Sequence, residues 1–157
     1  MKKIILAACI AVAGCVCASA QQSQAVGVNL GYGSEIETFS IGAKYQHGIT
    51  DAIRGEVAFN YFFENQGLSM WDIDVTGHYL FNVAEKVKVY PLAGLTYTNV
   101  KVDWGFGSAS DGKFGVNLGG GAEYALTETI SIGAELKYSL ISDWDQILLQ
   151  IGATYKF

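Results

Sequence analysis

The sequence from Trp71 to Tyr79, Trp-Asp-Ile-Asp-Val-Thr-Gly-His-Tyr, alternates apolar and polar side chains almost without exception. Successive side chains of a β-strand point to opposite faces, so this stretch predicts a strand with one apolar and one charged face. The same period recurs along the chain, punctuated by Gly, Asn, Asp, Ser and Thr, and no window of useful length has helical spacing. We therefore expect an all-β fold with eight strands, at about 25–33, 37–47, 53–63, 70–81, 87–99, 113–125, 130–141 and 146–157.

The two faces of these strands differ sharply in charge. The apolar face of every predicted strand lacks Asp, Glu, Lys and Arg. The opposite face carries equal numbers of cations and anions together with one histidine: Lys44, Arg54, Lys88, Lys137 and Lys156; Glu56, Asp72, Asp74, Glu123 and Glu135; and His78. Such a balance suits charges that pair with one another in a narrow lumen, since an unpaired buried charge is costly.

The alternation by itself permits two folds, because either face could meet water. A soluble sandwich or a lipocalin-like barrel would bury the apolar face. Along these strands, however, aromatic side chains gather near the ends, and aliphatic ones lie between the two ends. Tyr61 and Phe63, for example, come at the end of a predicted strand that has Val57 near its middle. Two aromatic girdles around an aliphatic band are typical of strands that cross a membrane, and a globular core has no reason to sort residues by height.

The N-terminus has the pattern of an export signal. Lys2 and Lys3 precede a short apolar run at 4–12, and Ala18-Ser19-Ala20 matches a cleavage site. We expect residues 1–20 to be a signal peptide and 21–157 to form a single domain. Lipidation of Cys15 is the alternative processing. All three cysteines lie within the signal, so the mature chain has no disulfide or thiolate site.

The C-terminus carries a second recognisable pattern. Gln150, Gly152, Tyr155 and Phe157 resemble the terminal assembly signal of outer-membrane barrels, in which a glycine is followed by an aromatic residue and a terminal aromatic residue. With this pattern, residues 25–157 resemble the small outer-membrane β-barrels of the outer membrane protein X and A type, without the periplasmic peptidoglycan-binding domain of the A type.

The resemblance implies an eight-stranded antiparallel up-and-down barrel in the outer membrane of a Gram-negative bacterium. Its expected partners are outer-membrane lipid, lipopolysaccharide and the barrel-assembly machinery. A closed barrel is also what the backbone requires, because hydrocarbon offers no hydrogen bonds to an open sheet edge.

Composition and spacing exclude other classes of protein. The net charge of −5 argues against a nucleic-acid partner, and nothing indicates a cofactor. Asp72, Asp74 and His78 share one strand face but extend over about 20 Å, so they cannot hold one metal ion. No nucleophile, base and carboxylate motif indicates catalysis.

The remaining candidates for function lie in the predicted outer loops, at about 33–38, 64–69, 99–113 and 141–146. These loops are acidic, and the contact candidates are Asp103, Trp104, Phe106 and Trp144. We expect a non-catalytic barrel, its lumen filled by paired polar side chains, with a structural or surface-interaction role through an extracellular partner. The alternatives are a narrow porin-like channel for water, ions or small solutes and, less favoured, a lipid A-modifying barrel enzyme.

Overall fold

The computed structural model describes residues 23–35, 37–65, 68–103, 108–141 and 144–157. The expected signal peptide and Cys15 lie outside these ranges. The described residues form nine strands: β1 (Gln24–Gly33), β2 (Thr38–Gly48), β3 (Ile53–Asn65), β4 (Leu68–Tyr79), β5 (Phe81–Ala84), β6 (Val87–Asp103), β7 (Ser108–Ala125), β8 (Ile130–Ile141) and β9 (Trp144–Lys156). None of the described segments is a helix long and apolar enough to cross a membrane.

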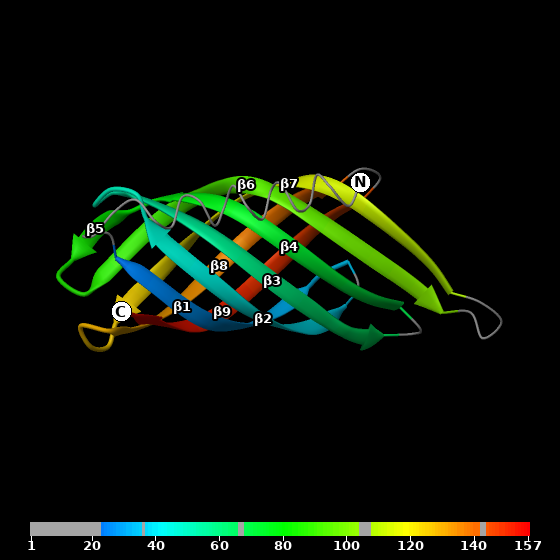
Figure 1. The fold of residues 1–157 in the computed structure, drawn as a ribbon, viewed down its shortest axis with the longest axis horizontal. Coiled ribbons are helices and arrows are strands. Elements are labelled where there is room, and N and C mark those ends of the chain that lie inside the picture. Colours follow the sequence, from blue (N-terminus) through cyan, green and yellow to red (C-terminus); the bar gives the residue numbers. More distant parts are fainter. Residues whose placement is uncertain (1–22, 36, 66–67, 104–107, 142–143) are drawn as a thin grey trace.

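Eight of these strands close into a barrel. Each long strand pairs antiparallel with its neighbours in sequence, β1 also pairs with β9, and β4 pairs with β6. The short strand β5 continues the pairing of β4 along β6. The pairing is interrupted at Tyr79 and Leu80, which lie opposite Pro91 and Tyr90, and Pro91 has no N–H to donate to the ladder. The predicted eight-stranded antiparallel up-and-down barrel is confirmed (Figure 1).

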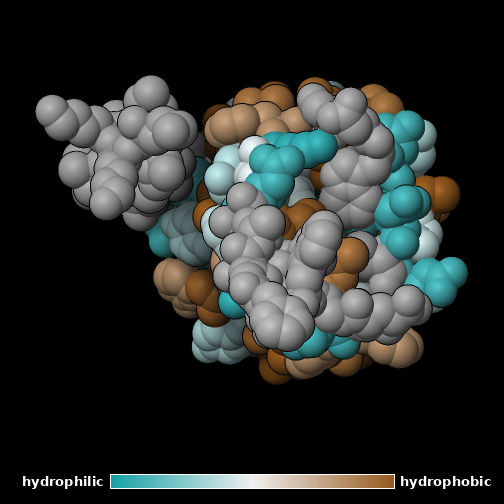
Figure 2. Space-filling model, turned by 90° about the vertical axis from the view of Figure 1, so that its right-hand side faces the viewer, coloured by the Kyte–Doolittle hydropathy of each residue, from teal (hydrophilic) through white to brown (hydrophobic). Residues whose placement is uncertain are grey.

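The charged face of the strands points inward. Asp72 and Asp74 are 3% and 2% exposed, whereas Ile73 and Val75 between them are 39% and 48% exposed. The same alternation runs round the ring, and Figure 2, which looks at the loop end, shows apolar side chains at several places on the outer rim. An apolar exterior around a charged interior excludes the soluble alternatives.

The two ends of the barrel differ in length. Short turns join the strands at the end that holds both the start of β1 and the end of β9, and we call it the turn end. At the opposite loop end, the β6–β7 hairpin reaches farthest (Figure 1).

The prediction of a loop at 99–113 is mostly wrong. Strand pairing continues through Val100↔Asp111 to Asp103↔Ser108, so β7 begins at Ser108. Its Gly, Ser and Asp residues indicate a loop by composition, but hydrogen bonds along a hairpin ladder hold such residues in strands. Asp103 is accordingly the last residue of β6 and Trp144 the first of β9. Trp104 and Phe106 lie outside the described residues.

Candidate functional site

The lumen holds a chain of charged contacts that link opposite walls. At its centre, Lys137 of β8 is 1% exposed, with Nζ 3.1 Å from Asp74 Oδ2 and 3.7 Å from Glu135 Oε2. Asn117 also donates to Asp74, at 2.8 Å. An eight-stranded barrel is narrow enough for side chains to meet across its lumen. Closure of the ring therefore brings side chains of β4 and β8 close enough to form an ion pair.

Glu135 connects this centre to the next part of the network. Its Oε1 accepts hydrogen bonds from Lys44 Nζ and from Tyr90 Oη, each at 2.8 Å. Lys44 Nζ also lies 3.5 Å from Glu56 Oε2, and Gln46 donates to the same oxygen at 2.7 Å. Three buried carboxylates are thus held by two lysines and by neutral donors, which is how buried charge is tolerated.

Nearer the turn end, an arginine spans the lumen. Arg54 Nη1 of β3 donates to Glu123 Oε2 of β7 at 2.7 Å, and its Nε donates to His78 Nδ1 at 3.3 Å. The guanidinium carbon lies 4.9 Å from the centre of the Tyr90 ring, which itself stacks on His78 at 4.7 Å. Arg54, His78, Tyr90 and Glu123 therefore form a floor across the barrel, which we call the arginine floor.

A glycine makes this floor possible. A Cβ on Gly121 would lie 2.7 Å from Cζ of Tyr90, because the Tyr90 ring lies directly over the β7 backbone. Any larger side chain at this inward position would displace the ring from His78 and Arg54. The lack of a side chain at Gly121 thus makes room for the Tyr90 ring.

Towards the loop end, amides replace the ion pairs. Asn60 donates to Asp72 Oδ1 at 2.6 Å, and its own Oδ1 accepts from Asn29 at 2.8 Å and from Gln150 at 2.9 Å. Among the described residues, Asp72 forms no ion pair and is held by this amide. Several buried polar atoms nearby have no hydrogen-bond partner, among them Ser40 Oγ and Thr98 Oγ1.

An apolar layer follows beyond the amides. Phe62, Met70 and Leu148 are at most 1% exposed and pack together inside the barrel, with Val100 against them. Sequence reasoning missed this layer, although the signal was present. Extending the inward positions of Asn60, Asp72 and Gln150 by two residues reaches Phe62, Met70 and Leu148 respectively.

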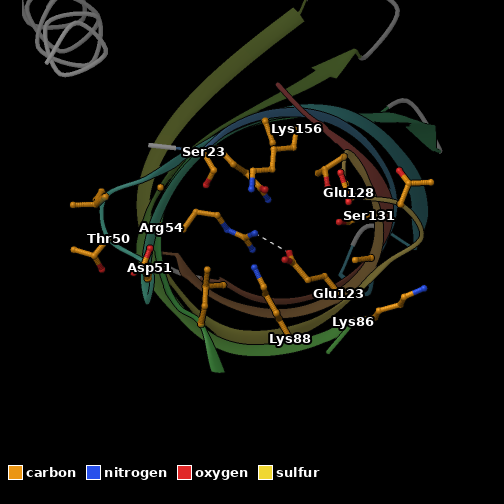
Figure 3. Close-up of a pocket in the computed structure, with 18 of the residues that line it drawn as sticks. Ser23, Thr50, Asp51, Arg54, Lys86, Lys88, Glu123, Glu128, Ser131 and Lys156 are labelled. Carbon is orange, nitrogen blue, oxygen red and sulfur yellow. Dashed lines mark hydrogen bonds and ion pairs between the residues drawn. The ribbon is translucent and has the colours of Figure 1, made fainter. Parts of the chain in front are cut away.

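Two of the expected lumen cations lie outside the buried network. Lys88 is half-buried and Lys156 exposed, and both line a cavity of about 920 Å³ at the turn end, which we call the vestibule. Figure 3 shows both lysines pointing inward, near the Arg54–Glu123 bridge. The buried network itself therefore contains Lys44, Arg54 and Lys137 against Glu56, Asp72, Asp74, Glu123 and Glu135.

The residues expected to form the assembly signal belong to β9 and its end. Gln150 points into the lumen, and Gly152 packs against β1, where a Cβ would lie 2.5 Å from Val28 O. Tyr155 and Phe157 are exposed on the outside, and the Phe157 amide donates to Gln24 O at 3.0 Å. These residues thus lie along the β1–β9 seam that closes the barrel.

His78 contacts a neighbouring side chain through each of its ring nitrogens. Its Nδ1 faces Arg54 and its Nε2 lies 3.0 Å from Thr76 Oγ1. Within the described ranges, no three Asp, Glu, His or Cys side chains gather as metal ligands would.

Solved structures similar to this chain are small membrane barrels. The N-terminal β-barrel domain of Pseudomonas aeruginosa OprF matches with a TM-score of 0.77 and 15% identity, covering 86% of this chain and 97% of that one. Neisserial surface protein A matches with 0.71 and 18%, and Ail, the attachment invasion locus protein of Yersinia pestis, with 0.65 and 21%. Each of these two covers 87% of this chain and 97% of its own.

The search of curated proteins found no match. The family described as "Outer membrane protein beta-barrel domain" matches residues 7–157, nearly the whole sequence. Together with the closed ring of strands and its apolar exterior, this match shows that the chain belongs to the outer membrane protein beta-barrel domain family and is an integral protein of the outer membrane.

Proposed function

We propose that this protein is a non-conducting, non-catalytic barrel that presents its loop end for contact at the cell surface. The observation that carries the proposal is the succession of layers across the lumen. The arginine floor, the Lys44–Glu135–Lys137–Asp74 ion pairs and the apolar layer of Phe62, Met70 and Leu148 follow one another along the axis.

A planar lipid bilayer tests the filled lumen. The purified barrel should give no discrete conductance steps, because an ion would have to break cross-lumen ion pairs and then pass dry apolar side chains. Wild-type steps of uniform size would overturn this part of the proposal in favour of a narrow channel. The vestibule and the unpaired buried oxygens are the observations that favour that second candidate, since both could hold water.

The surface-contact role is supported by the β6–β7 hairpin, which projects beyond the other strands, and by the names of two relatives. Ail is named an attachment invasion locus protein and has been solved with the heparin analogue sucrose octasulfate, and another relative is a neisserial surface protein. In the sequence, the charged residues of the predicted outer loops are mainly acidic: Glu35, Glu37, Glu64, Asp103, Asp111, Asp143 and Asp145 against Lys101 and Lys113. We therefore expect its partner to be cationic, unlike a sulfated sugar.

Shortening the hairpin tests this role. Cells that display the wild-type protein should adhere to a surface coated with a basic protein. A variant lacking residues 102–109, which removes the tip of the hairpin and Asp103, should adhere less. The gel shift of the folded barrel on boiling serves as the control that the variant still assembles. Equal adhesion by both proteins would contradict the proposal. Binding of sucrose octasulfate to the displayed protein would contradict it as well, because the partner would then be anionic.

A further inference from the structure

The vestibule is lined by two lysines, Lys88 and Lys156, that lie outside the buried ion-pair network. Lys88 faces Glu123 across the β6–β7 ladder, yet Glu123 Oε2 lies 2.7 Å from Arg54 Nη1. Among the described residues, no acid forms an ion pair with Lys88 or Lys156. Two like charges thus share one concave, partly enclosed space.

The acids of the cavity lie at other places than the two lysines. The cavity is lined by Arg54, Lys86, Lys88 and Lys156 and by Asp51, Glu85, Glu123 and Glu128. Asp51, Glu85 and Glu128 belong to the turns at the rim, whereas Lys88 and Lys156 come from inward positions of β6 and β9. Figure 3 shows both lysines directed into the opening, while Lys86 points away from it.

The walls between the lysines offer neutral polar groups. Ser131 of β8 and Thr154 of β9 line the cavity, and Gln46 lies at its inner side. A volume of about 920 Å³ is within the range of small-molecule sites and far exceeds the needs of a single ion. Lysines act as point charges that suit phosphate, and hydroxyl and amide groups suit a sugar or polyol.

We propose that the vestibule binds a small phosphorylated molecule, with Lys88 and Lys156 holding the phosphate and Gln46, Ser131 and Thr154 facing the polar remainder. The phosphate dianion pairs with the two lysine ammonium groups, while Arg54 stays paired with Glu123. Arg54 and Glu123 of the arginine floor line the inner part of the site.

Nuclear magnetic resonance of the full-length folded barrel in detergent micelles tests the proposal. Inorganic phosphate and glucose 1-phosphate are the two probes, with glucose and sodium chloride of matched ionic strength as controls. We expect the chemical shifts of the Gln46, Ser131 and Thr154 amide signals to change in a saturable way with either phosphate probe and with neither control. A tighter response to the sugar phosphate than to inorganic phosphate supports the whole proposal. A response to inorganic phosphate alone supports a phosphate site at the two lysines and overturns the role given to Gln46, Ser131 and Thr154.

Lys88→Gln and Lys156→Gln should each weaken binding about tenfold, the effect of losing one charged hydrogen bond. Lys86→Gln is the matched control, since it removes the same charge from the same cavity rim but from a side chain that points away. Absence of saturable shifts, the same shifts with sodium chloride, or equal weakening by Lys86→Gln would each overturn the proposal. Both lysines are at least partly exposed, so their variants should fold.

Discussion

At the scale of single residues, the stability of the barrel depends on buried charges in its lumen. Each of these charges would be costly to bury alone, and each is offset by the ion pairs and hydrogen bonds that it forms. Lys137 is the clearest case, because its buried ammonium group lies between Asp74 and Glu135 with no access to solvent. Removing one partner of such a pair leaves an uncompensated buried charge, which costs more than the pair itself contributes. Stability of the barrel should therefore respond far more to Lys137 than to lysines of the turns.

Lys137→Met should lower the free energy of unfolding by about 3–5 kcal/mol, measured by urea titration of the barrel in phospholipid. The methylene stem keeps its packing, so the loss reports the charge. Lys86→Met, at an exposed position in a turn, is the control and should change stability by less than about 0.5 kcal/mol. Similar losses for both variants would contradict the central role of the Lys137 ion pairs.

At the scale of elements, the seam between the first and last strands decides whether a ring can form. β1 and β9 pair from Ala25↔Lys156 to Gly33↔Leu148 and are the strands farthest apart in sequence. All other contacts between neighbouring strands arise within hairpins, which form locally. The seam therefore demands the largest loop closure, and the terminal residues of β9 lie directly on it.

Deleting Phe157 should reduce the amount of folded barrel in outer-membrane fractions severalfold, since it removes the last residue of the expected assembly signal. Phe157→Tyr keeps an aromatic terminus and should assemble normally. Refolding both variants from urea into detergent separates recognition from stability: the deletion should still fold there. Normal insertion of the deletion variant in cells would count against the signal.

The strand boundaries show what local patterns can and cannot predict. The faces of Asp72 to Val75 follow from alternation alone, and so does the number of strands. The β6–β7 hairpin is longer than expected because Ser108 and Asp111 are held by partners on β6, and a ladder partner is invisible in local composition. The inward Phe62, Met70 and Leu148 follow the same alternation, but their contact inside the lumen depends on three separate strands meeting at one height.

At the scale of the whole molecule, the barrel has an inside-out distribution of polarity suited to a bilayer. Its outward aliphatic side chains lie between aromatic ones, and its backbone groups pair around a ring without an edge in the spanning region. A charge on the outside should therefore cost energy in proportion to its depth in the lipid.

Val75→Arg should destabilise the barrel in lipid by about 2–4 kcal/mol, because Val75 lies in the middle of β4 and faces outward. Phe39→Arg, near the loop end of β2, should cost about 0–1 kcal/mol beyond the loss of its own contacts. Urea titration in phospholipid vesicles measures both. A silent Val75→Arg would show that this face does not contact lipid.

The folded protein should resist sodium dodecyl sulfate at room temperature and migrate differently after boiling, because a closed ring of strands can open only by breaking a whole ladder. Far-ultraviolet circular dichroism in detergent should show β-structure before heating. Unchanged migration after boiling would contradict a closed barrel, and the Lys137→Met variant should shift at a lower temperature than wild type.

By itself the sequence determined the strand number and the charged and apolar faces, because a period of two and a separation of charge are local properties of the chain. The membrane as the solvent followed from two further sequence features, the aromatic residues near the strand ends and the C-terminal pattern of Gln150, Gly152, Tyr155 and Phe157. Only the tertiary structure decided which charges meet. Arg54 forms the ion pair with Glu123, although Lys88 is the residue opposite Glu123 on the ladder. Closure of the ring places β3 and β7 across a lumen narrow enough for a long guanidinium to span, and that distance depends on all eight strands together.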